Sequence, residues 1–298
     1  MSNSATHRSG FVNIIGNPNV GKSTLMNALV GERLSIVTAK AQTTRHRIMG
    51  IVNGDNYQIV YSDTPGILTP SYKLQERMMD FVDTAIGDAD IVLYVTDVVE
   101  SGDKNRAYIE KLQHIDAPVL LVINKIDLSN QHDLEQLTTQ WRGLLPKAEI
   151  FPASALEKFN LDNLFNRIVE LLPPSPPWFD KELFTDRNLR FFASEIIREK
   201  ILQNYGKEIP YCTEVVIEEF KEDKDMYRIQ AVIHVVRESQ KGILIGTQGS
   251  MLKKVGTQAR KDMEAFFDQK VFLQLFVKVS PNWREDKRKL KQFGYVEA

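Results

Sequence analysis

The 298-residue chain carries 38 Lys and Arg against 39 Asp and Glu, and a net charge of -1 by itself predicts no particular partner. This length suits two domains better than one core. A single cysteine, Cys212, excludes an intrachain disulfide and a multi-cysteine metal site, and we expect it to be an inert core residue. The five histidines show no ligand spacing, so we expect no metal site built from protein side chains alone.

The charge is unevenly distributed along the chain. Residues 1–177 carry a net charge of -4 and residues 178–298 carry +3. The stretch from residue 237 to the end holds 13 basic and 7 acidic residues, a net charge of +6. This asymmetry points to a polyanion as a partner of the C-terminal part.

Two features indicate where the protein works. The first ten residues are polar and lack the apolar stretch of a secretory signal. No run approaches the ~20 apolar residues that span a bilayer. We therefore expect a soluble, cytoplasmic protein.

Short apolar runs alternate with longer helix-compatible segments in the first half of the chain. We expect five of them to be strands: Phe11–Ile15, Gln58–Ser62, Ile91–Thr96, Val119–Ile123 and Glu149–Ala153. This alternation predicts an α/β domain with a mainly parallel sheet and helices on both faces. A further run, Ile48–Val52, is separated from Gln58 by a segment with Asn53-Gly54, which predicts one antiparallel hairpin. Apolar residues at helical spacing between positions 161 and 171 predict a closing helix.

A phosphate-binding loop is predicted where the first strand meets a helix-forming run. Backbone N–H groups of such a loop cradle phosphates, while Lys22 reaches the β- and γ-phosphates and Ser23 offers its hydroxyl to Mg²⁺. The residues assigned to nucleotide binding here are Gly16, Asn17, Pro18, Asn19, Val20, Gly21, Lys22, Ser23 and Thr24.

Three further motifs complete the nucleotide site, and one of them favours guanine over adenine. The sequence Asp63-Thr64-Pro65-Gly66 follows a strand, placing a carboxylate for Mg²⁺ and a glycine N–H for a γ-phosphate. The sequence Asn124-Lys125-Ile126-Asp127 follows another strand, and Asp127 can accept two hydrogen bonds from guanine, which adenine cannot donate. Ser154 and Ala155, after the last strand, form the expected loop behind the base.

These four motifs, in this order and spacing, resemble the translation-factor-related class of P-loop GTPases. The resemblance implies that a threonine of the polar segment 40–47 closes on Mg²⁺ and the γ-phosphate. We choose Thr44, with Thr43 as the alternative. The catalytic set is then Lys22, Thr44, Asp63 and Gly66, and the Mg²⁺ ligands are Ser23, Thr44 and Asp63.

Three basic residues in the same segment have open roles. Arg45 and Arg47 are expected either to contact phosphate or RNA, or to be solvated charges on a mobile loop. We expect His46 to be a solvated loop residue.

At position 67, where Ras-like enzymes carry the glutamine that orients the attacking water, this chain has Ile67. Hydrolysis is therefore expected to be slow unless stimulated.

The segment Pro173-Pro174-Ser175-Pro176-Pro177 ends the first domain, because proline stops helices. We place a GTPase domain at 1–172, a Pro-rich linker at 173–180 and a second domain at 181–298. The second domain reads helix (189–204), strand (213–220), strand (226–237), turn, helix (250–267) and strand (271–279), a smaller α+β unit.

A Gly-x-x-Gly loop, Gly246 to Gly249, lies between two helical segments of this domain. Together with the order α-β-β-α-α-β it resembles a type II KH domain, in which the glycines let the backbone approach a nucleic acid beside an apolar groove. The residues assigned to RNA binding are Lys241, Ile245, Gly246, Thr247, Gln248, Gly249, Ser250, Lys253 and Lys254. The tail from Trp283 to Phe293 interleaves aromatic and basic residues, and it either extends the RNA surface or forms a packed terminal helix.

The whole arrangement resembles the Era family of bacterial ribosome-assembly GTPases, from about Phe11 to Phe293. The stretch 42–47, the motif at 63–66, the Gly-x-x-Gly context and the Pro-Asn-Trp-Arg sequence at 281–284 carry the resemblance. It implies a monomeric GTPase that uses GTP, GDP and Mg²⁺ and binds the 3′ end of small-subunit (16S) ribosomal RNA. It also implies a role in maturation of the 30S subunit or its precursor.

Two alternatives stay open at this point. In the first, the C-terminal module of a regulatory GTPase docks on a protein or membrane surface, since a basic amphipathic segment also binds anionic lipid weakly at the inner face of the membrane. In the second, an RNA-binding protein keeps a vestigial nucleotide site. The intact Lys22, Ser23, Asp63 and Asp127 disfavour the second.

Overall fold

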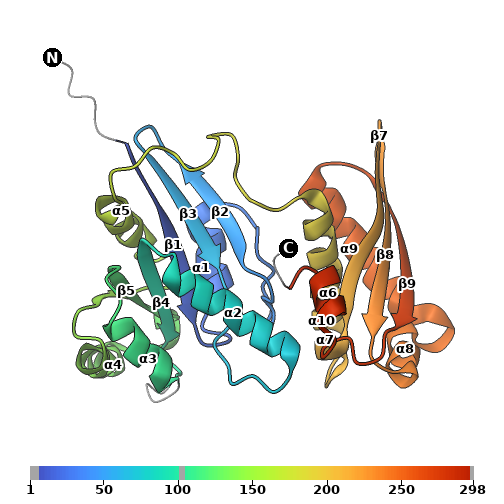
Figure 1. Cartoon of the computed structure of the whole chain (residues 1–298), viewed down its shortest axis with the longest axis horizontal. Coiled ribbons are helices and arrows are strands. Elements are labelled where there is room, and N and C mark those ends of the chain that lie inside the picture. Colours follow the sequence, from blue (N-terminus) through green and yellow to red (C-terminus); the bar gives the residue numbers. More distant parts are fainter. Residues whose placement is uncertain (1–6, 101–104, 296–298) are drawn as a thin grey trace. The chain divides into compact units, whose positions relative to one another are not determined.

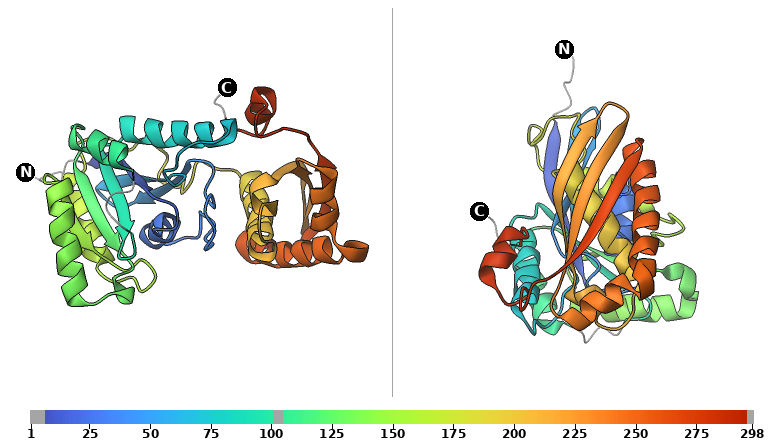
Figure 2. Two further views of the ribbon diagram at one scale, coloured as in Figure 1. Left: turned by 90° about the horizontal axis from the view of Figure 1, so that it is seen from below. Right: turned by 90° about the vertical axis from the view of Figure 1, so that its right-hand side faces the viewer.

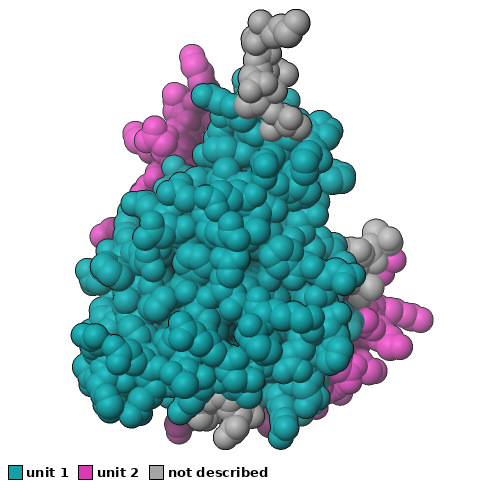
Figure 3. Space-filling view, turned by 90° about the vertical axis from the view of Figure 1, so that its left-hand side faces the viewer, with its two compact units in different colours: residues 1–35, 44–70, 78–186 teal, residues 36–43, 71–77, 187–298 magenta. Residues whose placement is uncertain are grey.

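The computed structural model describes residues 7–100 and 105–295, so most of the polar N-terminal segment lies outside the described part. Figure 3 colours the two compact units into which the chain divides. Unit 1 comprises Met1–Ser35, Thr44–Pro70 and Met78–Asp186. Unit 2 comprises Ile36–Thr43, Ser71–Arg77 and Arg187–Ala298. Two short segments from the first half of the sequence therefore belong to the second unit.

Unit 1 is built on a six-stranded sheet (Figure 1). Its strands are β1 (Arg8–Gly16), β2 (Ile48–Asn53), β3 (Tyr57–Asp63), β4 (Ile91–Asp97), β5 (Val119–Asn124) and β6 (Glu149–Pro152). They lie in the order β2-β3-β1-β4-β5-β6. All neighbouring pairs are parallel except β2 and β3, which form the expected antiparallel hairpin. The prediction of a mainly parallel sheet is confirmed.

The helices associated with this sheet are α1 (Lys22–Val30), α2 (Lys73–Gly87), α3 (Arg106–Gln113), α4 (Gln131–Leu144) and α5 (Leu161–Leu171). Figure 2 shows helices on both faces of the sheet. This double cover explains why all seven residues of β4 are buried, because a parallel strand covered on both sides has no solvent face. Helix α5 begins and ends where the periodicity predicted it.

The parallel strands bring their carboxyl ends to one edge of the sheet. There β1 ends at Gly16, β3 at Asp63, β4 at Asp97 and β5 at Asn124. Ligands of open α/β sheets bind outside the carboxyl ends of the strands. The topology therefore gathers the predicted motifs, which are far apart in sequence, at one place.

Unit 2 contains a three-stranded sheet in the order β7-β8-β9. Its elements are α6 (Leu189–Asn204), α7 (Ile209–Cys212), β7 (Glu214–Asp223), β8 (Met226–Val235), α8 (Glu238–Ile245), α9 (Ser250–Phe267), β9 (Val271–Val279) and α10 (Lys287–Gln292). Strand β8 runs antiparallel to β7 and parallel to β9. Helices α6 and α9 pack on one face of the sheet. The short helix α7 was not predicted from the sequence.

The core of unit 2 follows from the alternation of β9. Val271 is buried and Leu273 and Leu275 pack against the core, whereas Phe272 and Phe276 are exposed on the other face, as predicted. Cys212 is buried in the same core, and its thiol donates to the carbonyl of Ile209, in agreement with an inert role.

The tail is packed rather than free. The Trp283 side chain is fully buried, its Nε1 donates to the carbonyl oxygen of Cys212 at 3.0 Å, and the Phe293 ring lies against it. Trp283 therefore has no face for a nucleic-acid base. It is packed, as the second alternative expected, but it lies in a turn before α10 and not in the helix itself. Within the described residues, no helix is both long and apolar enough to cross a membrane.

Candidate nucleotide site and nucleic-acid groove

The phosphate loop connects β1 to α1 and depends on two glycines. Gly16 has φ 149° and Gly21 has φ 96°, both in the range that favours glycine. A Cβ at Gly16 would lie 2.1 Å from the carbonyl oxygen of Val95, and one at Gly21 would lie 2.2 Å from Nδ2 of Asn124. The neighbouring strands thus leave room only for glycine at both positions.

Lys22 supplies a buried positive charge inside this loop. Its Nζ donates to the carbonyl oxygen of Asn17 at 2.8 Å. Burial lowers the pKa of Lys22 to about 8, and the negative charges of Asp63 and Glu100 oppose that effect. A buried ammonium held by one neutral carbonyl is stabilised by an incoming anion, because a phosphate replaces the water that burial removed.

Three oxygen-bearing side chains meet beside Lys22. The Ser23 hydroxyl donates to Oδ2 of Asp63 at 2.6 Å and lies 2.9 Å from the Thr44 hydroxyl, which is 3.2 Å from the same carboxylate oxygen. The other oxygen of Asp63, Oδ1, is buried and has no hydrogen-bond partner. Burial raises the pKa of Asp63, and hydrogen bonds from Ser23, Ser35 and Thr44 together with the charge of Lys22 oppose that effect.

These residues fit Mg²⁺, which prefers oxygen ligands. The unpartnered carboxylate oxygen marks a place where a cation would lower the energy of the site. Among the described residues no group of three or more His, Cys, Asp or Glu side chains is placed to hold a metal ion. A cation here would therefore share its coordination between these few protein oxygens and phosphate oxygens.

The two candidate threonines lie in different surroundings. Thr44 belongs to unit 1 and contacts Ser23 and Asp63, as described. The Thr43 hydroxyl donates to the carbonyl of Lys40 at 2.6 Å and lies 2.7 Å from the hydroxyl of Thr38. This geometry favours Thr44 over Thr43 as the ligand.

The residues predicted to read the base are held by a hydrogen-bond network at the carboxyl end of β5. Asn124 donates through Nδ2 to the carbonyl of Val20 at 2.8 Å and accepts at Oδ1 from the backbone N–H of Ala155 at 2.9 Å. The Ser154 hydroxyl donates to Oδ1 of Asp127 at 2.6 Å. Asn124 therefore joins the phosphate loop to the loop behind the base, and Ser154 fixes the orientation of the Asp127 carboxylate.

Lys125 forms part of the same network. Its Nζ donates to the carbonyl of Asn19 at 2.6 Å and pairs with Oδ2 of Asp97 at the same distance. Asp97 was not predicted from the sequence, although it ends the strand β4 in the way that Asp63 ends β3. Its position directly after an apolar strand run was the signal in the sequence that could have identified it as a site residue.

The segment after Asp63 closes the phosphate end of the site. The Thr64 hydroxyl donates to the carbonyl of Ile14 at 2.7 Å, and a Cβ at Gly66 would lie 2.8 Å from the backbone of Pro18. The N–H of Ile67 donates to the carbonyl of Gly16 at 3.0 Å and its side chain is buried. Ile67 is therefore a packing residue that cannot orient a water molecule.

The basic residues at 45–47 do not lie on a solvated loop. Arg45, His46 and Arg47 are all buried. The Arg47 guanidinium binds Asp88 at 3.0 Å, Asn13 at 3.1 Å and Ser62 at 3.1 Å. The His46 ring packs near Phe81, with 6.1 Å between centroids. The expectation of a solvated His46 is wrong. Arg47 is not a solvated charge either, because its guanidinium is held by these three side chains.

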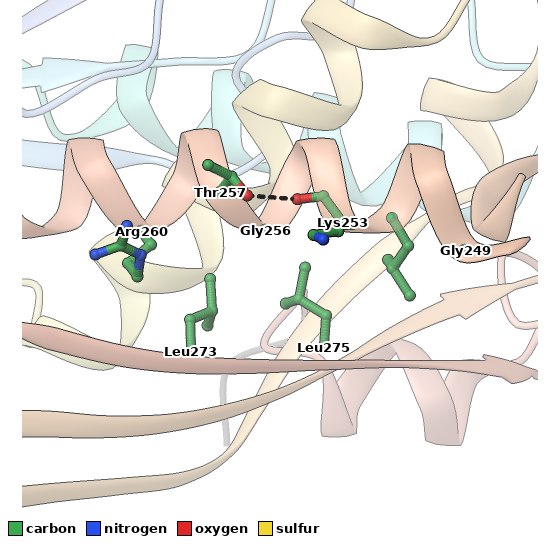
Figure 4. Close-up of a pocket in the computed structure, with 8 residues that line it drawn as sticks. Gly249, Lys253, Gly256, Thr257, Arg260, Leu273 and Leu275 are labelled. Carbon is green, nitrogen blue, oxygen red and sulfur yellow. Dashed lines mark hydrogen bonds between the residues drawn. The ribbon is translucent and has the colours of Figure 1, made fainter.

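The second site is a groove in unit 2, between α9 and β9 (Figure 4). It encloses about 380 Å³. The residues that line it are Gly249, Leu252, Lys253, Gly256, Thr257, Arg260, Leu273 and Leu275. Leucine side chains from both elements form its apolar walls, and Lys253 and Arg260 add positive charge; Arg260 is also paired with Glu264 at 2.8 Å.

The Gly-x-x-Gly loop opens this groove at one end. Gly246, Gln248 and Gly249 have φ of 72°, 51° and 76°. The loop follows α8, whose last turn is fixed because the Tyr205 hydroxyl donates to the carbonyl of Leu244 at 2.6 Å. The remaining predicted RNA residues surround it: Thr247 and Ser250 are exposed in and after the loop, Lys254 is exposed on α9, and Lys241 and Ile245 are half-buried on α8.

Known proteins match both parts of the chain. A family described as 50S ribosome-binding GTPase matches residues 11–125, and a family described as KH domain matches residues 208–284. The GTPase Era of Syntrophus aciditrophicus is 47% identical over 296 residues, covering 97% of this chain and 96% of the relative. The GTPase Era of Ectopseudomonas mendocina is 43% identical over 299 residues, covering 100% of both.

Solved structures agree with these relatives. The crystal structure of Era in complex with MgGDPNP and nucleotides 1506–1542 of 16S ribosomal RNA has a TM-score of 0.93 and 38% identity, and the match covers 98% of this chain and 100% of that chain. A structure of an Aquifex aeolicus Era variant bound to GDP·AlF4⁻ also has a TM-score of 0.93, with 37% identity, and covers 97% of this chain and 100% of that one. The likeness therefore extends over both units.

Proposed function

The chain belongs to the Era family of GTPases, and we propose on that basis that it is a GTP-hydrolysing switch that binds the 3′ end of 16S ribosomal RNA. Its task is then to assist maturation of the 30S subunit. The observation that carries the proposal is the full-length match to Era structures, one of which contains MgGDPNP and this part of 16S ribosomal RNA. The geometry of both sites supports it.

In the nucleotide site each residue has a distinct part. Lys22 and the backbone N–H groups of the loop bind the phosphates, and the N–H of Gly66 binds the γ-phosphate. Ser23, Thr44 and Asp63 would hold Mg²⁺, which when bound neutralises charge on the β- and γ-phosphate oxygens. The Thr44 hydroxyl would join this ligand set only while a γ-phosphate is present, so we propose that the conformation of its segment depends on the nucleotide state.

Specificity rests on Asp127, which would accept hydrogen bonds from N1–H and the 2-amino group of guanine. Adenine offers no such pair of donors, so the oriented carboxylate would remain unpaired in its place. Ser154 keeps this carboxylate in position. Guanine nucleotides are therefore the substrates and products.

Hydrolysis by the chain alone is expected to be slow. The side chain at position 67 cannot orient water, because Ile67 is apolar and buried. Backbone groups or a partner must supply that contact. Rapid turnover without RNA or ribosomes would contradict this part of the proposal.

The groove between α9 and β9 suits single-stranded RNA. Its leucine walls receive bases, while the Gly-x-x-Gly loop lets the RNA backbone approach and Lys253 neutralises a phosphate. Lys254, Lys241, Thr247 and Ser250 surround the mouth of the groove. RNA binding by these residues remains part of the proposal.

Coupling between the nucleotide and RNA is supported by contacts inside unit 2. The ammonium of Lys40 donates to the carbonyl oxygens of Leu202 and Tyr205, which end α6, and the Arg198 guanidinium donates to the carbonyl of Thr43. Tyr205 in turn holds the last turn of α8, directly before Gly246. The segment that leads into Thr44 is therefore bonded to the helix that supports the RNA loop, and we propose that this bonding transmits the nucleotide state.

Two further proposals concern organisation. We propose a GTPase domain at 1–172, a linker at 173–180 and an RNA-binding domain at 181–298. We also propose that the protein acts as a monomer in the cytoplasm, with weak contact at the inner face of the membrane through its basic C-terminal part.

A binding experiment tests the RNA assignment. The full chain, loaded with a non-hydrolysable GTP analogue, is titrated with an oligonucleotide of the 16S 3′ end and with a scrambled oligonucleotide of the same composition, at two salt concentrations. We expect affinity that falls steeply with salt and a clear preference for the natural sequence. Equal binding of both oligonucleotides would contradict the proposal and favour a module that docks on any polyanionic surface.

A further inference from the structure

The carboxylate of Glu100 lies next to the phosphate loop, where it has no part in the mechanism above. One of its oxygens accepts from Nδ2 of Asn17, the second residue of the loop, and the other accepts from the Thr96 hydroxyl at 3.1 Å. The backbone that leads up to it is also hydrogen-bonded. Oδ1 of Asp97 accepts the N–H groups of both Val99 and Glu100 at 3.0 Å.

Asn17 forms hydrogen bonds both with this carboxylate and with the ammonium of Lys22. Its side chain is only 4% exposed, and its Oδ1 is buried without a hydrogen-bond partner. The bond to Glu100 therefore helps to hold this buried side chain in place. The backbone carbonyl of the same residue accepts from Nζ of Lys22. One residue therefore separates a fixed negative charge from the ammonium that binds phosphate.

We infer that Glu100 weakens the binding of nucleotides in proportion to their phosphate charge, and so sets how fast the site exchanges its nucleotide. This inference rests on the proposed binding of guanine nucleotides at the phosphate loop. Like charges separated by several ångströms of protein repel each other, and each additional phosphate adds to the repulsion. The carboxylate thus offsets part of the attraction exerted by Lys22 and the loop N–H groups, and acts as a residue that tunes affinity.

The variant Glu100→Gln isolates the charge, because glutamine keeps the size and retains an oxygen that accepts from Asn17. Affinities and dissociation rates of the full chain are measured for a GTP analogue, GDP and GMP at constant Mg²⁺. We expect the GTP analogue to bind about fivefold more tightly to the variant, chiefly through slower dissociation. GDP should gain less and GMP little, and the gain should shrink with added salt.

The matched control is Glu110→Gln, which removes an exposed carboxylate that pairs with Arg106 at 3.3 Å on α3 of the same unit. It should leave all three affinities unchanged. If Glu100→Gln weakened the binding of all three nucleotides equally, Glu100 would be a structural anchor only. If all three affinities stayed unchanged, its charge would not act on phosphate. Either result would overturn this inference and leave the proposed function standing. A wild-type chain without affinity for GTP or GDP would overturn the proposed function as well.

Discussion

Asn124 occupies the space that any side chain at position 21 would need: a Cβ on Gly21 would lie 2.2 Å from Nδ2 of Asn124. The same Nδ2 donates to the carbonyl of Val20, one residue earlier in the phosphate loop. The loop that we propose binds phosphate and the motif that we propose selects the base are therefore packed directly together. A change on one side must disturb the other.

Gly21→Ala should abolish most nucleotide binding. The substitution imposes both a positive φ and a clash with Asn124, and strain of about 1–3 kcal/mol corresponds to a loss of roughly fivefold to 150-fold in GTP affinity. The measurement is the dissociation constant of a fluorescent GTP analogue. The matched control is Gly31→Ala at the end of α1, where φ is also positive, at 85°, but a Cβ would meet nothing within 4 Å. It should lower stability and preserve affinity; equal loss in both variants would refute the role of the clash.

Asp127→Asn should transfer the preference of the site from guanine to xanthine nucleotides. The amide can donate to the 2-oxo group of xanthine but cannot accept both guanine donors, so discrimination should change by at least about a hundredfold. Competition between GDP and XDP measures this ratio directly. Asp162→Asn, on the exposed face of α5, provides a control that should not alter it. Unchanged guanine selectivity in Asp127→Asn would refute the base-reading role.

Gly249→Asp should weaken RNA binding without affecting hydrolysis. Gly249 has φ 76° and a Cβ there would meet nothing within 4 Å, whereas a Cβ at Gly246 would lie 2.7 Å from Met251 and disturb the fold. Asp and Asn both tolerate positive φ, so Gly249→Asn is a control that differs only in charge. A carboxylate facing RNA phosphate should cost at least about tenfold in affinity relative to Asn. Equal affinities of the two variants would place the RNA backbone elsewhere.

Acid should destabilise unit 2 partly through His234. Burial lowers the pKa of His234, the nearby Lys278 and Lys289 lower it further, and Glu218 opposes them. The ring also contacts Ser280 at 2.8 Å and packs near Phe293. The unfolded chain therefore binds more protons than the folded chain just below pH 6.5, and stability falls as the pH decreases through that window.

The variant His234→Gln should show a weaker loss of stability between pH 6.5 and 5 than the wild type. Thermal unfolding across this range measures it. His132→Gln, at an exposed position on α4, is the control and should behave like the wild type. If His234→Gln lost as much stability in acid as the wild type, protonation of His234 would not be the cause of that loss.

The sequence alone predicted those elements whose structure is determined by a local pattern of residues. The strands of unit 1 are apolar runs that end in recognisable motifs, and α5 lies at the residues its periodicity predicted. The exposed Phe272 and the inward Leu273 follow from the period of two in β9. In each case the information is contained within a few consecutive residues.

Local patterns failed where the partner is distant in sequence. Arg47 is buried because it binds Asp88, which lies 41 residues further along the chain, and nothing in its own segment indicates this. Glu100 carries no motif, and only the pairing of β1 with β4 brings it next to Asn17. The sequence favoured Thr44 but kept Thr43 as an alternative, because the approach of the Thr44 hydroxyl to Asp63 is a contact between residues 19 positions apart.

The central claim is that the nucleotide state controls RNA affinity, and one titration tests it most directly. A short single-stranded RNA matching the 3′ end of 16S ribosomal RNA is titrated against the full chain loaded with a non-hydrolysable GTP analogue, and in parallel against the GDP form, at two salt concentrations. Our account predicts tighter and sequence-selective binding in the GTP-analogue form at both. Equal affinity in the two forms would contradict it and leave a GTPase and an RNA-binding module without demonstrated coupling.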